Sequence, residues 1–273
     1  MNSVEETFGL EEAHRLLKPR PDDCHKNCFG RILLLAGSEQ YPGAAILASR
    51  GSLRAGAGVV TLCTPSELPA AMNLPASVIL RHQTPPMEGF QAILLGSGSD
   101  FAYARDILPI LLKMNLPLVL DATALRCLAT FPQVLQENKA PLFLTPHPGE
   151  MQALLATFAP EAMESPRREQ ATILARKTGA VIILKGYHTI VAMPDGRSSI
   201  NLSGGPALAT AGTGDVLAGI LTALAAQYPP YDAARLAVFL HGLAADLYPH
   251  APHTFIADDL PDLLPVAFTQ TLS

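Results

Sequence analysis

Short apolar runs recur along the chain, and segments with helical patterning lie between them. Each run holds three to five residues and lacks the polar–apolar alternation of a half-exposed strand. Because strands that are apolar on both sides are typical of parallel sheets covered by helices on both faces, we expect such a sheet. The runs expected to form strands are Ile32–Ala36, Val59–Cys63, Val78–Leu80, Ala92–Leu95, Leu118–Leu120, Leu142–Leu144 and Val181–Leu184.

Segments expected to be helical follow most of these runs. Their alternation with strands implies βαβ units joined by right-handed crossovers. The expected helices are Ala44–Ala55, one that begins at Pro65–Glu67, Tyr103–Lys113, Ala122–Leu128, Gly149–Ala156 and Ala171–Lys177.

The pattern changes after Leu184. Only a short glycine-containing link separates Val181–Leu184 from Thr189–Met193, which predicts a hairpin and an antiparallel edge to the sheet. A third short strand is expected at Ser198–Leu202. The remaining helices are expected at Asp215–Ala226, Tyr231–Leu247 and Ala257–Phe268.

This order of elements predicts one α/β domain, a three-layer α/β/α sandwich with a mostly parallel central sheet and an antiparallel edge hairpin. We place the domain at residues 30–273. Residues 1–29 are expected to form an N-terminal arm with a helix at Leu10–Leu17.

Composition narrows the possible partners. The 273 residues are 49% hydrophobic, which is enough for a sizeable core, and the net charge is −5. That charge gives no reason to expect electrostatic capture of nucleic acid. The N-terminus lacks the apolar segment of a signal peptide, and no uncharged apolar run reaches about 18 residues. We therefore expect a cytoplasmic protein without a nucleic-acid or membrane partner.

The most informative segment is Gly212-Thr213-Gly214-Asp215, which precedes an apolar helix. Glycines let a ligand approach the backbone, and the first N–H groups of a helix have no partner within it. A phosphate group is a natural guest at such a helix end. Asp215 has two interpretations: a carboxylate that caps the helix, or a general base that takes a hydroxyl proton as the oxygen attacks phosphorus.

Two further segments carry candidate chemistry. In Thr145-Pro-His-Pro-Gly-Glu150, His147 either faces a substrate or belongs to a rigid turn in which Glu150 caps the next helix. Lys185 follows a buried strand, so it is either a solvated strand end or a contact to a nucleotide phosphate.

Several familiar sites are excluded. The chain has no P-loop, no Gly-x-Gly-x-x-Gly fingerprint, no nucleophile elbow and no His-Glu-x-x-His helix. The segment Cys24-His25-x2-Cys28 could supply one pair of zinc ligands. The chain has no second Cys/His pair at the usual distance, and zinc sites typically have two such pairs. His241, on an apolar helix, is expected to be a packing residue.

Together these segments resemble the ribokinase-like superfamily and, more narrowly, the ADP/ATP-dependent NAD(P)H-hydrate dehydratases. The resemblance spans about residues 30–265 and rests on the order of Thr145-Pro-His-Pro-Gly-Glu and Gly212-Thr-Gly-Asp. It implies a stand-alone dehydratase, without the epimerase domain that some members carry. Such an enzyme phosphorylates the hydroxyl of NADH or NADPH hydrate from ADP or ATP, with Mg²⁺, and phosphate then leaves.

The resemblance also implies roles for individual residues and a homotetramer. Asp215 would be the base, and the Gly212, Thr213 and Gly214 backbone would stabilise the transferring phosphoryl group. Glu150 would approach Mg²⁺ indirectly, through water. The nucleotide would contact Lys185, Gly186, Tyr187, His188, Thr189 and Gly214. The hydrate pocket would be lined by Ala44, Gly98, His147 and Asp215.

Two loops depart from the family pattern. Gly96-Ser-Gly-Ser-Asp100 stands where the family has Gly-Pro-Gly-Leu-Gly, and Asp121-Ala-Thr-Ala124 stands where it has Asp-Ala-Asp-Ala. We expect activity to survive, because Asp215 and its anion hole remain, with Asp100 altering phosphate or metal binding. Two alternatives stay open: a small-molecule kinase of the same superfamily, and a non-catalytic nucleotide-binding sensor.

Overall fold

The computed structural model describes residues 6–67 and 73–273. Within these residues ten strands form one sheet in the order β1-β10-β9-β8-β7-β6-β5-β2-β3-β4. The strands are β1 (Glu6–Phe8), β2 (Arg31–Leu35), β3 (Val59–Cys63), β4 (Ile79–Arg81), β5 (Ala92–Leu95), β6 (Leu118–Leu120), β7 (Leu142–Leu144), β8 (Val181–Leu184), β9 (Ile190–Ala192) and β10 (Ser198–Asn201).

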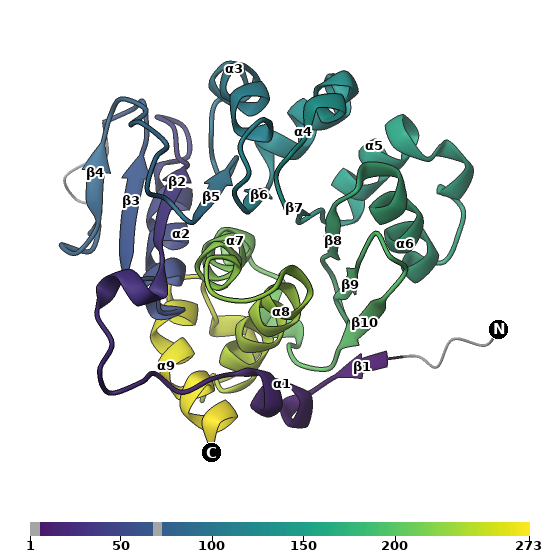
Figure 1. Ribbon diagram of the computed structural model, residues 1–273. Coiled ribbons are helices and arrows are strands. Elements are labelled where there is room, and N and C mark those ends of the chain that lie inside the picture. The colour runs from purple at the N-terminus through teal and green to yellow at the C-terminus, as the bar shows by residue number, and fades with distance from the viewer. Residues whose placement is uncertain (1–5, 68–72) are drawn as a thin grey trace.

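Helices cover both faces of this sheet, which confirms the three-layer prediction (Figure 1). Helices α3 to α6 pack on one face; α2 and α7 to α9 lie on the other. The helices are α1 (Leu10–Leu16), α2 (Pro42–Arg54), α3 (Phe101–Leu112), α4 (Thr123–Thr130), α5 (Pro148–Phe158), α6 (Arg167–Thr178), α7 (Thr213–Ala225), α8 (Pro230–Asp246) and α9 (Asp259–Leu272).

The apolar strands supply core to both layers. In β2, Ile32 and Leu34 belong to the core beneath α7 and α8, while Leu33 and Leu35 belong to the core beneath α3 and α4. All four are fully buried. Successive side chains of a strand point to opposite faces, so a strand between two helical layers must be apolar throughout.

The sheet is parallel from β4 to β8, and β9 is antiparallel to both β8 and β10. The predicted hairpin is therefore confirmed, but it is not at the edge. Strand β1 pairs in parallel with β10 and lies outside it. This strand was missed because Glu6–Phe8 has three residues, of which Phe8 alone is buried.

The predicted strands and helices are found close to their expected bounds, with small shifts at helix ends. Helix α7 begins at Thr213, two residues before the expected start. The helix start expected at Pro65–Glu67 is wrong, because these three residues form a bend and irregular backbone. The residues that follow, 68–72, lie outside the described residues. The division into an arm of residues 1–29 and a domain of 30–273 stays a prediction. In the part of the chain that the structure describes, no helix is long and apolar enough to cross a membrane.

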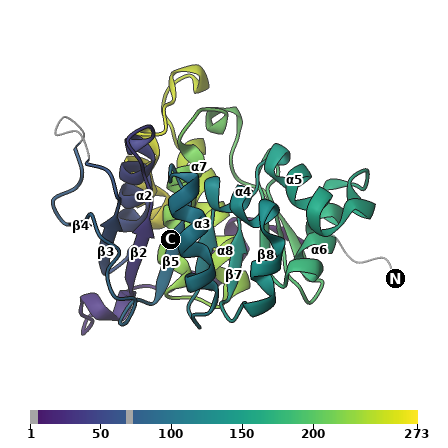
Figure 2. The same ribbon diagram turned by 90° about the horizontal axis from the view of Figure 1, so that it is seen from above.

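The strand order reverses between β2 and β5. Open α/β sheets bind ligands at such a switch point. The loops after both strands meet there, where the Gly37 N–H donates to the Ser97 carbonyl over 2.8 Å. Helices α2 and α7, which lie side by side, extend from this end of the sheet (Figure 2).

Candidate active site

The N-terminus of α7 is built on Gly212. This residue is the N-cap and has a φ of +93°, a left-handed conformation that favours glycine. A Cβ atom there would lie 2.6 Å from the Leu47 Cδ1 atom. Thr213 is held by hydrogen bonds from its hydroxyl to the carbonyls of Leu208 and Thr210, both 3.1 Å. The first N–H groups of the helix are thus fixed in place and free of helical partners.

Asp215 is the third residue of α7, so the interpretation of this residue as the N-cap is wrong. Burial, followed by the negative charge of Asp121, raises the pKa of Asp215 to about 7. The positive charge of Lys185 opposes this rise, and so does the polar Ser97 hydroxyl. A carboxyl with a pKa near neutral pH is suited to accept a proton from a substrate hydroxyl.

Asp121 follows β6 and is 2% exposed. Three donors converge on its carboxylate: the Ser97 hydroxyl at 2.9 Å, the Thr145 hydroxyl at 2.7 Å and the Lys185 ammonium at 3.0 Å. These donors come from the loops after β5, β7 and β8. The carboxyl ends of four adjacent parallel strands therefore share one buried polar cluster.

Lys185 lies within this cluster, and its side chain is 20% exposed. Its ammonium also lies 4.0 Å from the Glu150 carboxylate. Burial alone would lower the pKa of Lys185, but the carboxylates of Asp121, Glu150 and Asp215 together raise it. The interpretation of Lys185 as a solvated strand end is therefore wrong, because the charge is directed into the site.

His147 and Glu150 form a capping box at the start of α5. The His147 Nδ1 atom accepts from the N–H groups of Gly149 (3.0 Å) and Glu150 (3.3 Å). The Glu150 carboxylate in turn accepts from the His147 N–H over 2.9 Å. The rigid-turn interpretation is confirmed, and it leaves the His147 side chain 56% exposed. Glu150 links this turn to Lys185.

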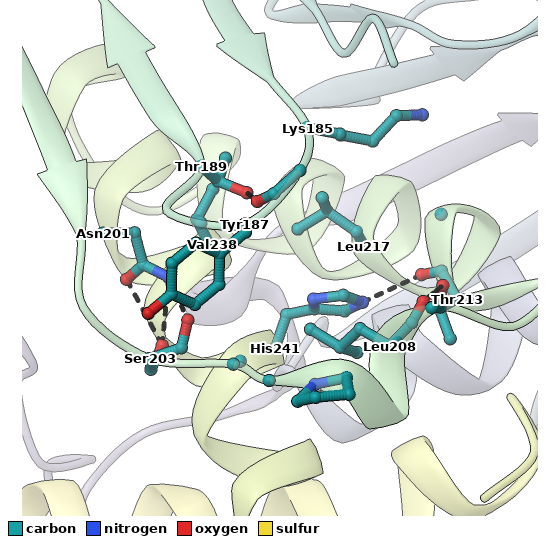
Figure 3. Close-up of a pocket in the computed structure, with 17 residues that line it drawn as sticks. Lys185, Tyr187, Thr189, Asn201, Ser203, Leu208, Thr213, Leu217, Val238 and His241 are labelled. Carbon is teal, nitrogen blue, oxygen red and sulfur yellow. Dashed lines mark hydrogen bonds between the residues drawn. The ribbon is translucent and has the colours of Figure 1, made fainter. Parts of the chain in front are cut away.

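A cavity of about 370 Å³ lies between the β8–β9 loop and helices α7 and α8 (Figure 3). Five of the six residues predicted to bind the nucleotide line it: Lys185, Gly186, Tyr187, Thr189 and Gly214. His188 is not among the lining residues. Its φ is +54° and its ring stacks on that of Tyr187, with centroids 3.9 Å apart.

The far wall of the cavity was not predicted from the sequence. It combines apolar side chains with polar groups from the loop after β10, and no motif marks this combination. His241 is part of this wall, and its Nε2 atom lies 2.9 Å from the Thr213 carbonyl (Figure 3). Burial lowers the pKa of His241 to about 4, so the ring is neutral and donates this bond. The other unpredicted lining residues are Asn201, Ser203, Gly204, Gly205, Pro206, Leu208, Ala209, Leu217, Val238 and Gly242.

Ala44 and Gly98 lie together at the switch point, outside the lining of that cavity. Gly98 has a φ of +66°, and a Cβ atom there would lie 2.6 Å from the Ala44 Cβ. The structure therefore brings these two predicted substrate residues together. Because Ser97 precedes Gly98 and bonds Asp121, this corner adjoins the Asp121 cluster.

The residues of the site fit a magnesium ion carried by nucleotide phosphates. Over residues 6–67 and 73–273 no three His, Cys, Asp or Glu side chains are grouped so as to hold a metal. Magnesium commonly uses one or two carboxylates plus phosphate oxygens and water. Both Asp121 oxygens are engaged, which leaves Glu150 as the carboxylate able to approach such an ion through water. In the separate cluster near the N-terminus, the Cys28 thiol and the His25 Nδ1 atom form a hydrogen bond of 3.2 Å.

Comparison with known proteins identifies the family. The profile of the NAD(P)H-hydrate dehydratase family matches residues 32–265. The chain belongs to the NAD(P)H-hydrate dehydratase family. It is 36% identical over 271 residues to the ADP-dependent (S)-NAD(P)H-hydrate dehydratase of Bacillus subtilis, with 94% of this chain and 96% of that protein covered.

Solved structures of similar proteins have the same fold. The ADP/ATP-dependent NAD(P)H-hydrate dehydratase of Bacillus subtilis, co-crystallised with ATP and Mg²⁺, superposes with a TM-score of 0.85 at 32% identity, covering 99% of each chain. A ribokinase-like superfamily protein of Enterococcus faecalis superposes with a TM-score of 0.83 at 25% identity, covering 98% of this chain and 96% of that one. The predicted ribokinase-like fold is therefore confirmed.

The family also contains longer proteins. The bifunctional NAD(P)H-hydrate repair enzyme of Moorella thermoacetica is 38% identical over 263 residues, which cover 88% of this chain and 49% of that protein. The chain thus spans about half the length of the bifunctional relatives that it matches.

Both departures from the dehydratase pattern lie at this site. Ser97, in place of the family's proline, donates to Asp121. Thr123, in place of an aspartate, is the first residue of α4. Asp100 is an exposed N-cap of α3, and its expected effect on phosphate binding stays a prediction.

Proposed function

We propose that this chain returns NADH or NADPH hydrate to the reduced nucleotide, with ADP or ATP as phosphoryl donor. The observation that carries the proposal is the placement of Asp215. A carboxyl with a pKa of about 7 lies in the first turn of a glycine-led helix that borders the cavity. The named dehydratase relatives favour this reaction over a kinase that keeps its phosphorylated product.

In this proposal the nucleotide occupies the cavity, held by Lys185, Gly186, Tyr187, Thr189 and Gly214, with its terminal phosphate at the start of α7. The His188 ring stacks on Tyr187 from outside the cavity. Ala44, Gly98 and His147 contact the hydrate, whose hydroxyl points at Asp215. The reactants therefore meet where the carboxyl ends of the strands converge.

The reaction follows from these positions. Asp215 accepts the hydroxyl proton as the oxygen attacks the terminal phosphorus, and the bond to the nucleotide's leaving oxygen breaks. The N–H groups of Gly212, Thr213 and Gly214 stabilise the charge on the transferring group. The ring-nitrogen lone pair then expels phosphate, because phosphate is a far better leaving group than hydroxide. Loss of a proton from the neighbouring ring carbon restores the ring double bond of the dihydronicotinamide. Bound Mg²⁺ would supply charge neutralisation on the phosphates, with Glu150 holding it through water.

The Asp215→Asn variant tests the role of Asp215. We expect turnover of NADH hydrate to fall by a factor of about 10² or more, while ADP and ATP still bind, because Asn cannot accept the proton. Asp106→Asn, at an exposed site on α3, is the matched control and should leave turnover unchanged. Full turnover in Asp215→Asn would exclude Asp215 as the base. Nucleotide binding without turnover in the unmodified chain would instead indicate a sensor.

Assembly and location belong to the same proposal. We expect a homotetramer, as the family resemblance implies, and a cytoplasmic location, as the sequence pattern predicts. Light scattering of the purified chain would check the assembly, and a monomer in solution would contradict it.

A further inference from the structure

One wall of the cavity, the loop after β10, consists largely of backbone. Ser203, Gly204, Gly205 and Pro206 line the cavity there. The two glycines have no side chain with which to anchor the loop. Asn201 holds its first residue, because the Asn201 side-chain N–H donates to the Ser203 carbonyl over 2.8 Å (Figure 3). The position of the rest of this wall therefore depends on the element behind it.

That element is helix α8. The Ser203 hydroxyl donates to the Phe239 carbonyl over 2.8 Å. A Cβ atom on Gly242 would collide with the Ser203 Oγ atom, so the lack of a side chain lets the loop lie directly on the helix. The Gly204 N–H donates to the Asp246 Oδ2 atom over 2.7 Å. Phe239, Gly242 and Asp246 follow at spacings of three and four positions, so they share one face of α8.

The stability of α8 does not explain the carboxylate of Asp246. Asp246 is the last residue of this helix, where the helix dipole favours a cation and disfavours a negative charge. Over residues 6–67 and 73–273 no Lys, Arg or His side chain forms an ion pair with it, and its hydrogen-bond donor is the Gly204 N–H. The charge costs the helix some stability, while the cavity wall gains a fixed position from it.

We propose that Asp246 is a positioning residue for the nucleotide: its carboxylate holds the Gly204 N–H and so fixes the backbone wall of the cavity against α8. The proposal rests on the nucleotide occupying this cavity, as in the proposed function. Asp246 is not among the lining residues, so it acts through the loop. A carboxylate suits this task, because hydrogen bonds to a charged acceptor are about twice as strong as neutral ones.

The effect of Asp246 should be confined to one of the two substrates. The residues proposed to contact the hydrate, Ala44 and Gly98, lie together at the switch point and outside the lining of this cavity. Asp215 belongs to α7, which the loop does not carry. A loosened wall must be ordered again when the nucleotide binds, and that cost is taken from the affinity. Nucleotide binding should therefore weaken while the chemical step and the hydrate KM stay unchanged.

The test compares Asp246→Ala with Asp246→Asn in the full chain. Calorimetry with Mg²⁺ gives the Kd of ADP and of ATP without hydrate, and turnover of NADH hydrate gives kcat and both KM values. In Asp246→Ala we expect the nucleotide Kd and KM to rise about tenfold, with kcat and the hydrate KM unchanged. In Asp246→Asn we expect a smaller rise, because the amide oxygen still accepts the Gly204 N–H.

Asp195→Ala is the matched control. The Asp195 carboxylate accepts the Arg197 N–H over 3.0 Å, in the turn at the other end of the β9–β10 hairpin. This variant loses a bond of the same kind away from the cavity, so the nucleotide Kd should not change.

An unchanged nucleotide Kd in folded Asp246→Ala would overturn the proposal, and so would an equal loss in Asp246→Asn or a lower kcat at unchanged nucleotide KM. If Asp246→Ala does not fold, Gly242→Ala decides, because its Cβ displaces the same loop from α8. A raised Kd at unchanged kcat supports the proposal, and an unchanged Kd overturns it. Since calorimetry needs no turnover, a chain that binds nucleotide but restores no NADH would refute the proposed function and leave this result standing.

Discussion

At the scale of single residues, the Asp215 carboxylate that the proposed reaction needs lowers the stability of the folded protein. The pKa of this carboxyl is raised to about 7, compared with about 4 for an aspartate in an unfolded chain. The folded protein therefore binds this proton more tightly than the unfolded chain does. The associated stability is fully present below about pH 4 and is lost as the pH rises through about 7.

This linkage predicts that Asp215→Asn stabilises the protein while inactivating it. At pH 8 we expect the Tm of Asp215→Asn to exceed that of the unmodified chain, because the neutral amide avoids the cost of a buried charge near Asp121. At pH 5 the difference should shrink. Thermal unfolding at both values measures it, with Asp106→Asn as the control at an exposed site. A variant less stable than the unmodified chain at pH 8 would contradict the pKa assignment.

The sequence predicted several of these residues but not their arrangement. Gly212–Asp215 was found from the glycine pattern, and its phosphate-binding geometry follows from helix physics. Asp121, Ser97 and Thr145 were not predicted as one cluster. They lie on three separate strand ends, and their proximity depends on strand order, which local sequence does not encode. His188 was predicted to bind nucleotide, but its ring stacks on Tyr187 rather than lining the cavity.

At the scale of elements, two features hold the site in position: the N-terminus of α5 and the contact between α2 and α7. The His147–Glu150 capping box satisfies N–H groups at the start of α5 and fixes Glu150 beside Lys185. On the other side, α7 carries Asp215 and packs directly against α2. A shift of either α5 or α7 would therefore displace a charged group of the site.

The capping box predicts a measurable stability cost. We expect His147→Ala to lower the free energy of unfolding by about 1 kcal/mol, because two backbone N–H groups lose their acceptor. Asp100→Ala is the comparison: Asp100 is the N-cap of α3 but makes no side-chain capping bond, so its loss should cost less. Urea unfolding at pH 7 measures both. Equal costs would show that the capping bonds of His147 contribute little.

The contact between α2 and α7 depends on glycine. A Cβ atom on Gly219 would collide with the Ala48 carbonyl oxygen, and one on Gly51 would lie 2.6 Å from the Val216 carbonyl oxygen. We expect Gly219→Ala to destabilise the protein by about 1–3 kcal/mol through overpacking. Gly43→Ala, in the open first turn of α2, should be neutral or stabilising by up to about 1 kcal/mol. Urea unfolding tests the pair, and a harmless Gly219→Ala would refute the close contact.

At the scale of the whole molecule, the sheet brings distant segments to one end. The apolar runs predicted the parallel strands, because a strand that is buried on both faces is apolar at every position. Strand β1 was not predicted, since its pairing with β10 depends on contacts nearly two hundred residues away in sequence. The switch point between β2 and β5 places Ala44 and Gly98 near the Asp121 cluster, with the cavity beyond Lys185. In the proposed function, the nucleotide takes the cavity and the hydrate takes the corner at Ala44 and Gly98.

The most direct test is a turnover measurement with the intact chain. Purified protein, Mg²⁺ and prepared NADH hydrate are mixed with ADP, with ATP or with neither, and both dihydronicotinamide absorbance and released phosphate are followed. The account predicts that absorbance returns only with a nucleotide, with one phosphate released for each NADH restored, and the more effective nucleotide is the preferred donor. Folded, nucleotide-binding protein that restores no absorbance with either nucleotide would contradict it.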